Sequence, residues 1–137
     1  MIAILDYGFG NVRSAQRAFT RHGVTAEITS EKNVCIEADG LVIPGVGAFG
    51  ACMDGLLKVN GDQIIKSRAA VGKPTLGICV GMQIMFEEGV EHGSYKGVGA
   101  LKGIVKKMNA PVLPHMGWNT VKIHGDSKLF KGVEKES

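Results

Sequence analysis

Short apolar segments alternate with amphipathic segments along most of the chain. Continuous apolar runs at residues 2–5 and 40–43 are typical of strands buried on both faces of a parallel sheet. Residues 25–29 and 75–79 predict two further strands of the same sheet. Residues 99–108 and 118–124 are more typical of antiparallel strands than of helices.

Helical spacing separates the predicted strands. A helix is predicted from Val12, with Asn11 as its N-terminal cap and Gly23 at its C-terminal end. Two more helices are predicted at residues 62–70 and 82–88. Strands that alternate with helices predict an α/β fold, a doubly wound and mostly parallel sheet with right-handed crossovers and helices on both faces.

Composition narrows the class of protein. The 137 residues fit a single domain spanning residues 1–137, with 45% hydrophobic and 21% charged residues. Aromatic residues make up only 6% and the net charge of +3 is scattered, which argues against nucleic-acid binding. No apolar run is long enough for a membrane span, and the N-terminus does not resemble a signal peptide. Three cysteines without a CxxC motif suit a reducing cytoplasm.

One cysteine lies in a sequence typical of a catalytic turn. Gly77-Ile-Cys79-Val-Gly81 falls where the fourth predicted strand gives way to a helix. A nucleophile on such a strand-to-helix turn needs small neighbours, because the backbones approach closely, and the helix N-terminus favours a thiolate. The alternative is a cysteine that only packs. Cys35 and Cys52 lack this context and are interpreted as structural.

A glycine-rich loop follows the third predicted strand. In Ile43-Pro-Gly-Val-Gly-Ala-Phe-Gly50, Pro44 ends the strand and the glycines free the backbone to direct N–H groups at a neighbouring site. An oxyanion hole for Cys79 would need such a second donor, in addition to the N–H of Val80. A simple turn or a phosphate-binding nest is the alternative, although the loop lacks the Lys-Ser/Thr of a P-loop.

Four sequence blocks together resemble the class I glutamine amidotransferases, which use a Cys-His-Glu triad. The blocks are DYGFGNVRS, IPGVGAFG, GICVGMQIMFE and PHMGWN, at residues 6–14, 43–50, 77–87 and 114–119. Within the family, they are most similar to the glutaminase subunits of imidazole glycerol phosphate synthase, from histidine biosynthesis. The similarity runs along essentially the whole chain.

This resemblance implies a role for each matching residue. Cys79 would attack the side-chain amide of glutamine, forming a thioester and releasing ammonia. The oxyanion hole would be formed by the N–H groups of Val46 and Val80. The glutamine pocket would be lined by Gly45, Gly47 and Gln83. The resemblance implies no cofactor and no metal ion.

The resemblance also implies a partner, a (β/α)₈ cyclase subunit that receives the ammonia. Asn11, Met116, Trp118 and Asn119 would lie at the interface with it. Each has an alternative: Asn11 as a helix cap only, and Trp118, the single tryptophan, as a core residue.

The general base of the triad has no clear candidate. In this family it is a histidine in a His-Pro-Glu stretch, and the 137 residues contain none. The four histidines are His22, His92, His115 and His124. Of these, only His115 lies in one of the four blocks, in a part that does not match the triad. We therefore expect a C-terminally truncated domain that lacks its last strands and helix, is inactive by itself, and has low stability or associates.

Three other interpretations stay open. The chain could be another class I amidotransferase, such as one that serves pyridoxal phosphate synthesis, although PHMGWN argues against this. It could be a redox sensor with a cysteine on a strand-to-helix turn, or a non-catalytic fragment that binds a partner.

Overall fold

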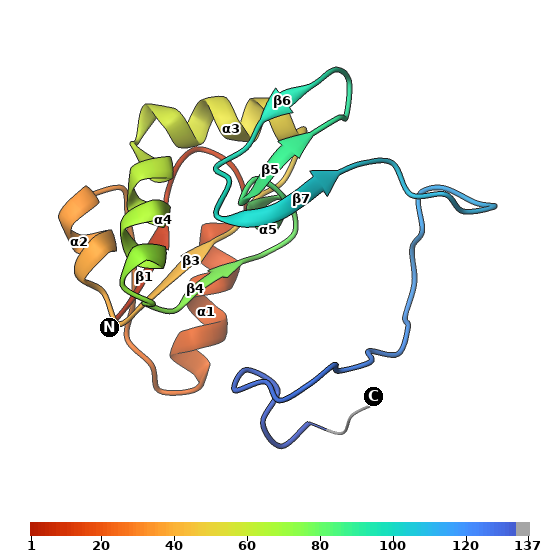
Figure 1. The fold of residues 1–137 in the computed structure, drawn as a ribbon. Helices are drawn as coiled ribbons and strands as arrows, with labels where there is room; N and C mark the ends of the chain where they lie inside the picture. Colours follow the sequence, from red (N-terminus) through yellow and green to blue (C-terminus); the bar gives the residue numbers. More distant parts are fainter. Residues whose placement is uncertain (134–137) are drawn as a thin grey trace. The chain divides into compact units, whose positions relative to one another are not determined.

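The structure is a computed structural model that describes residues 1–133 of the chain (Figure 1). It divides into two compact units, one of residues 1–107 and a second that begins at Met108. All helices and strands of the described residues lie in the first unit. The single domain predicted over residues 1–137 stays a prediction.

A four-stranded parallel sheet forms the centre of the first unit. Its strands are β1 (Ile2–Leu5), β2 (Ala26–Thr29), β3 (Gly40–Ile43) and β4 (Thr75–Gly77). They lie in the order β2-β1-β3-β4, and every neighbouring pair is parallel. This confirms the four predicted strands and the parallel sheet, although β4 ends two residues earlier than predicted.

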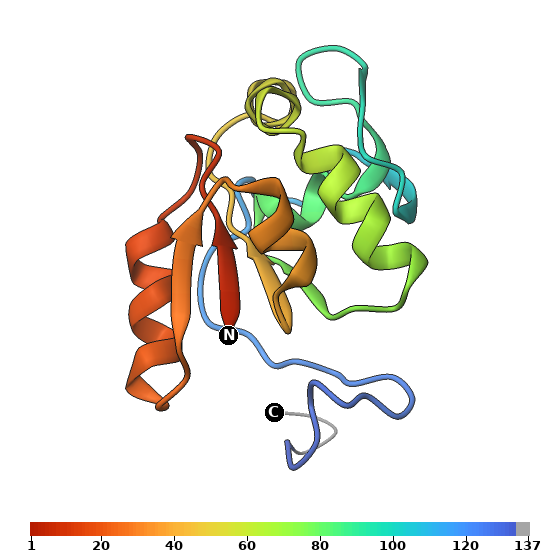
Figure 2. The same cartoon turned by 90° about the vertical axis from the view of Figure 1, so that its left-hand side faces the viewer.

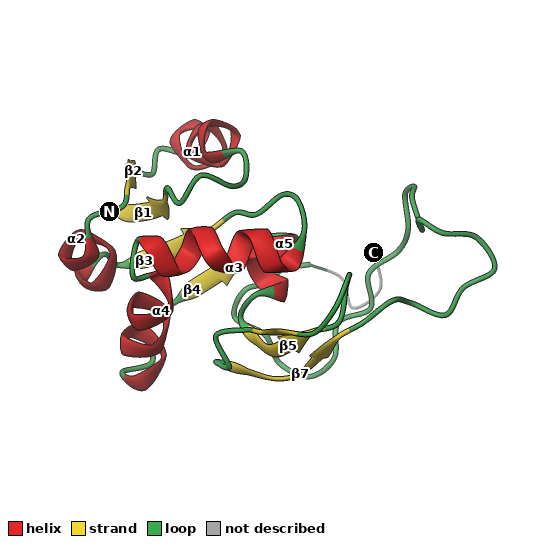
Figure 3. Cartoon of the chain, turned by 90° about the horizontal axis from the view of Figure 1, so that it is seen from above, coloured by secondary structure: helices red, strands yellow, loops and turns green. Residues whose placement is uncertain are grey.

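Helices cover both faces of the sheet, as predicted. On one face, α1 (Val12–Arg21) packs Val12, Ala15 and Phe19 against buried residues of the strands. The opposite face carries α2 (Lys32–Glu37), α3 (Phe49–Lys58) and α4 (Gly61–Ala70). Figures 2 and 3 show α1 and α4 on opposite sides of the sheet.

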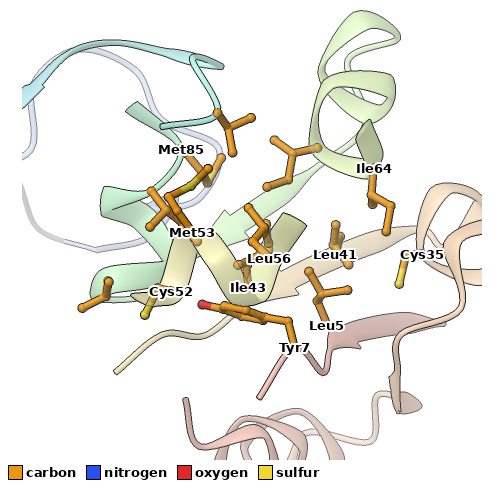
Figure 4. Packing of buried hydrophobic residues seen from close by; sticks show 14 of the residues in the cluster. Leu5, Tyr7, Cys35, Leu41, Ile43, Cys52, Met53, Leu56, Ile64 and Met85 are labelled. Atoms are coloured by element: carbon orange, nitrogen blue, oxygen red, sulfur yellow. The ribbon is translucent and has the colours of Figure 1, made fainter. Parts of the chain in front are cut away.

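The strands supply alternate residues to the two faces. Leu41 and Ile43 of β3 belong to the larger buried cluster, beneath α3 and α4, whereas Val42 belongs to the smaller cluster, beneath α1. Figure 4 shows part of the larger cluster, where Leu5, Leu41 and Ile43 meet Leu56 of α3 and Ile64 of α4.

The first helix begins and ends as predicted. The Asn11 side chain accepts a hydrogen bond from the Ser14 N–H at 3.0 Å and so caps α1. Gly23 takes a φ of +74°, a left-handed conformation that suits glycine after a helix. The short helix α2 was not predicted.

The helix predicted at residues 82–88 is wrong. One helical turn, α5 (Val80–Gln83), is followed by strand β5 (Phe86–Gly89). Backbone pairing accounts for the difference, because the Glu87 carbonyl accepts from the Gly97 N–H at 2.8 Å and Val90 N–H donates to Val105 at 2.9 Å. These bonds replace the helical bonds that the spacing suggested.

β5 forms a second, three-stranded sheet in the order β6-β5-β7, with β6 (Tyr95–Lys96) and β7 (Leu101–Val105). The strand predicted within residues 99–108 is confirmed as β7, but it runs parallel to β5 and is not antiparallel to it. The strand predicted at residues 118–124 is wrong, since no strand forms there. None of the helices in residues 1–133 is long and apolar enough to cross a membrane.

Candidate functional site

Cys79 lies on a strained turn at the carboxyl end of the parallel sheet. It follows β4 and is the N-terminal cap residue of α5, with φ 56° and ψ −122°. A residue with a β-carbon rarely adopts this conformation, and such strain persists only where surrounding contacts enforce it. The Cys79 residue is exposed, whereas Val80 and Gly81, which follow it, are buried. The turn therefore holds the sulfur out of the core.

The glycines around Cys79 are required by close backbone packing. A β-carbon at Gly81 would lie 1.9 Å from the Ile43 carbonyl oxygen, and one at Gly77 would lie 2.5 Å from the Met82 Cα. The small positions predicted on either side of Cys79 are thus confirmed. The helix that follows is only four residues long, so its dipole favours a thiolate less than the dipole of a longer helix would.

The glycine-rich loop lies against the same turn. A β-carbon at Gly45 would lie 2.3 Å from the Gly81 nitrogen and 2.8 Å from the Val80 carbonyl carbon. Ile78 N–H also donates to the Ile43 carbonyl at 2.9 Å, which joins the two segments just before they turn. The loop after β3 and the turn after β4 are therefore packed backbone to backbone.

A cavity of about 230 Å³ opens between these segments and the start of α1. Cys79 and Ile78 line it from the turn, Pro44, Gly45 and Val46 from the loop, and Asn11, Ser14 and Ala15 from α1. The structure thus brings together Cys79 with two residues predicted for the oxyanion hole and glutamine pocket. It also places Asn11, predicted at the partner interface, on the wall of the same cavity.

The two amides predicted as oxyanion donors have no partner within residues 1–133. Neither the Val46 N–H nor the Val80 N–H donates a hydrogen bond there. Val46 is 62% exposed, and Val80 begins α5, where N–H groups lack an intrahelical acceptor. Val46 lines the cavity beside Cys79, whereas Val80 is 7% exposed and is not among the residues that line it.

The remaining residues predicted for the glutamine pocket lie further along these segments. Gly47 is exposed and has a φ of +109°, a conformation that favours glycine. Gln83, at the end of α5, lines a different hollow of about 500 Å³ together with His92 and Lys106. The structure does not bring Gln83 into the cavity beside Cys79.

Cys35 and Cys52 are both buried, as expected of structural cysteines. Burial raises the pKa of the Cys35 thiol to about 11 and also raises the pKa of Cys52. Cys52, however, donates from its sulfur to the Val46 carbonyl at 3.4 Å, so it contacts the glycine-rich loop directly. Sequence reasoning missed this contact.

Tyr7 is a second residue that sequence reasoning missed. It follows β1, and its hydroxyl donates to the Pro44 carbonyl at 2.5 Å. Its position was a signal, because residues just after the carboxyl ends of parallel strands gather at one edge of the sheet.

The residues of the PHMGWN block lie in the second unit and are exposed. Trp118 is fully exposed and Met116 is 82% exposed, so the structure does not place Trp118 in a core. The Asn119 side chain accepts from the Thr120 N–H at 2.9 Å. Within the described residues, no histidine hydrogen-bonds to Cys79, and no three His, Cys, Asp or Glu side chains gather as a metal site.

Comparison with known proteins identifies the family. The family model described as "Glutamine amidotransferase class-I" matches residues 3–137. A solved structure titled "Crystal structure of glutamine amidotransferase" shares the fold, with a TM-score of 0.65 and 21% identity over 77% of this chain and 55% of that chain.

Curated relatives are more similar in sequence. The "Imidazole glycerol phosphate synthase subunit HisH" of Corynebacterium diphtheriae is 56% identical over 99% of this chain and 65% of its own length. The protein of the same name from Thermobifida fusca is 54% identical over the same shares of both chains. The chain thus spans about two thirds of the length of these relatives, 65% in both cases.

Proposed function

The chain belongs to the class I glutamine amidotransferase family, and from this we propose that Cys79 is the nucleophile of a glutaminase. One observation carries the proposal. The exposed Cys79, in its strained conformation, lines the same cavity as Gly45 and Val46 of the glycine-rich loop. A nucleophile and a set of unpaired amides beside it are what acyl transfer requires.

The proposed reaction has two stages. The sulfur of Cys79 attacks the side-chain amide carbon of glutamine, and the resulting oxyanion accepts hydrogen bonds from Val46 N–H and Val80 N–H. The C–N bond then breaks, the nitrogen takes a proton from a general acid and leaves as ammonia, and a γ-glutamyl thioester remains. Water cleaves the thioester, which gives glutamate and restores the thiol.

The glycine-rich loop supports binding of glutamine beside this sulfur. Gly45 lines the cavity, and Gly47 continues the same turn with an exposed backbone. Gln83 lines a different hollow in this structure, and its proposed contact with glutamine rests on the family resemblance alone. Backbone N–H and C=O groups in the glycine-rich loop can orient the polar ends of a small substrate.

The proton transfers need a base that is not evident in this chain. The 137 residues contain no His-Pro-Glu stretch, and within residues 1–133 no histidine hydrogen-bonds to Cys79. For this chain, we therefore expect reaction of Cys79 with electrophiles but negligible turnover of glutamine.

The curated relatives support a more specific proposal about the partner. They are named as a subunit of imidazole glycerol phosphate synthase, and we propose that this chain serves the same cytoplasmic enzyme as one subunit of a heterodimer. The ammonia would pass to a (β/α)₈ cyclase that makes imidazole glycerol phosphate and AICAR in histidine biosynthesis. Asn11, Met116, Trp118 and Asn119 are proposed to face that partner, and the exposure of Met116 and Trp118 is consistent with this.

Labelling of the three cysteines tests the proposal. The chain is treated with a chloroketone analogue of glutamine, and in parallel with iodoacetamide, which lacks the amino-acid portion; peptide mass spectrometry then gives the rate at each cysteine. We expect the chloroketone to modify Cys79 at least about 100 times faster than Cys35 or Cys52. This preference should exceed the preference for Cys79 shown by iodoacetamide, which reflects the exposure of the sulfur alone. Equal chloroketone rates at all three cysteines would refute the proposed function.

Pull-down tests the partner separately. A cyclase barrel should retain this chain, and replacing Trp118 with alanine should weaken retention, because exposed tryptophans are frequent anchors of interfaces. Retention that is unaffected by both Trp118→Ala and Met116→Ala would contradict the proposed interface.

A further inference from the structure

We propose that Tyr7 and Cys52 are positioning residues that hold the Pro44–Gly47 turn beside Cys79. The inference rests on the proposed glutaminase, in which this turn supplies backbone donors to the reacting oxygen. Neither side chain lines the cavity beside Cys79, so each would act through the backbone that it holds.

Both residues reach the turn from the buried side. Tyr7 is 5% exposed and Cys52 of α3 is completely buried, and both belong to the larger buried cluster. Tyr7 donates its hydroxyl hydrogen to the Pro44 carbonyl at 2.5 Å, and Cys52 donates from its sulfur to the Val46 carbonyl at 3.4 Å. In Figure 4, the Tyr7 hydroxyl points toward Cys52.

These two bonds set the orientation of two peptide groups in the turn. In a planar trans peptide, the carbonyl and the following N–H point in opposite directions. With the Pro44 and Val46 carbonyls directed to the buried donors, the N–H groups of Gly45 and Gly47 point away from the buried cluster. The peptide group that carries the Val46 N–H lies between the Cα atoms of Gly45 and Val46. Both ends of this peptide are therefore fixed by the hydrogen bonds to the Pro44 and Val46 carbonyls.

Tight packing makes the position of the turn depend on these donors. A β-carbon at Gly45 would lie 2.9 Å from the Tyr7 hydroxyl oxygen and 2.3 Å from the Gly81 nitrogen. The turn is therefore packed closely against both the hydroxyl and the segment that follows Cys79. Loss of the hydroxyl leaves a buried carbonyl without this donor, which favours a shift of the turn toward water.

Both donors keep their protons over a wide pH range. Burial, with a further contribution from neighbouring Cys52, raises the pKa of the Tyr7 hydroxyl far above its usual value. Burial also raises the pKa of the Cys52 thiol. Each group therefore remains protonated, and able to donate, at neutral pH.

The test compares matched variants of this chain. Tyr7→Phe removes the hydroxyl, and Tyr95→Phe is its control, because Tyr95 is exposed and its hydroxyl makes no hydrogen bond within residues 1–133. Cys52→Ala removes the thiol donor and Cys52→Ser replaces it with a hydroxyl donor, and Cys35→Ala is the control for loss of a buried thiol. For each variant, the labelling rate of Cys79 is measured with the chloroketone analogue of glutamine and with iodoacetamide.

A positioning role predicts a selective loss. Tyr7→Phe and Cys52→Ala should lower the chloroketone rate at Cys79 by about tenfold or more, which is a smaller loss than removal of an oxyanion donor itself. Their iodoacetamide rates should change by less than about twofold, because that reaction does not use the turn. Cys52→Ser should restore most of the chloroketone rate, and the two control variants should behave like the wild type.

Three results would overturn the inference. One is a wild-type chloroketone rate in both Tyr7→Phe and Cys52→Ala, and another is an equal fall with both reagents, which indicates general disruption of the fold. The third is a wild-type chain in which the chloroketone shows no preference for Cys79, a result that refutes the proposed function as well. If Tyr7→Phe fails to fold, the difference between Cys52→Ala and Cys52→Ser decides the question.

Discussion

Strain at Cys79 links the local backbone to the proposed chemistry. The residue adopts φ 56°, which a side chain with a β-carbon disfavours by about 1–3 kcal/mol. The close packing of Gly45 against Gly81 holds this conformation in place. The conformation keeps the Cys79 residue exposed, close to the Val46 and Val80 amides, which donate no hydrogen bond within residues 1–133.

Replacement of Cys79 measures this strain directly. We predict that Cys79→Gly is more stable than Cys79→Ala by about 1 kcal/mol, because glycine accepts the positive φ that alanine does not, while its greater freedom in the unfolded chain offsets part of the gain. Urea unfolding followed by circular dichroism would show the difference in the free energy of unfolding. Equal stability of the two variants would mean that the turn is not strained.

Sequence reasoning could predict some of these residues and not others. Cys79 and its flanking glycines lie within five consecutive residues, so a local pattern identifies them. Tyr7 and Pro44, by contrast, are 37 residues apart and meet only when β1 and β3 pair in the sheet. Cys52 carries no chemical signal until the helix α3 places it beneath Val46.

Among the elements, α2 depends on a single side chain of α4. Arg68 is completely buried, and one of its terminal nitrogens donates to the Cys35, Ile36 and Ala38 carbonyls at 2.7–3.0 Å. These carbonyls lie at the C-terminal end of α2, where no intrahelical donors remain. The other terminal nitrogen donates to Pro74, which precedes β4, at 2.8 Å. Arg68 therefore joins α2, α4 and β4.

We predict that Arg68→Met destabilises the chain by about 3 kcal/mol or more, since it leaves several buried carbonyls without a donor. Arg17→Met is the matched control, because Arg17 lies at an exposed position of α1. The expected change in its free energy of unfolding is within about 0.5 kcal/mol. Urea unfolding of both variants measures the difference. Similar stabilities would contradict the role assigned to Arg68.

The sequence pattern did not predict strands β5 and β6, which form only by pairing with other segments of the chain. Residues 82–88 have helical spacing, but Phe86–Gly89 pairs with β6 and β7 and becomes a strand. Close approach allows this pairing, because a β-carbon at Gly97 would lie 2.0 Å from the Phe86 carbonyl oxygen. Strands β1 and β3, in contrast, were evident from apolar runs that belong to one segment each.

In the molecule as a whole, buried thiol and hydroxyl groups make stability fall at alkaline pH. Burial raises the pKa of Cys35 from 9.0 to about 11, and also raises the pKa values of Tyr7 and Cys52. Above pH 9, the unfolded chain releases protons that the folded chain still holds. Because unfolding releases these protons, a rise in pH then favours the unfolded state.

The contribution of Cys35 to the free energy of unfolding should therefore be constant below about pH 9. It should fall as pH rises from 9 toward 11. Urea titrations at pH 7.5 and pH 10 would show the fall. Cys35→Ala should reduce the difference between the two pH values, even though it lowers stability at both. An identical difference in wild type and Cys35→Ala would contradict the assignment.

The structure of the chain after reaction with the chloroketone analogue of glutamine tests the central claim most directly. We predict an adduct on the sulfur of Cys79 whose oxygen lies about 2.7–3.1 Å from the nitrogens of Val46 and Val80. An adduct on another cysteine, or one on Cys79 whose oxygen contacts neither amide, would contradict the claim that the loop after β3 and the turn after β4 form one acyl-transfer site.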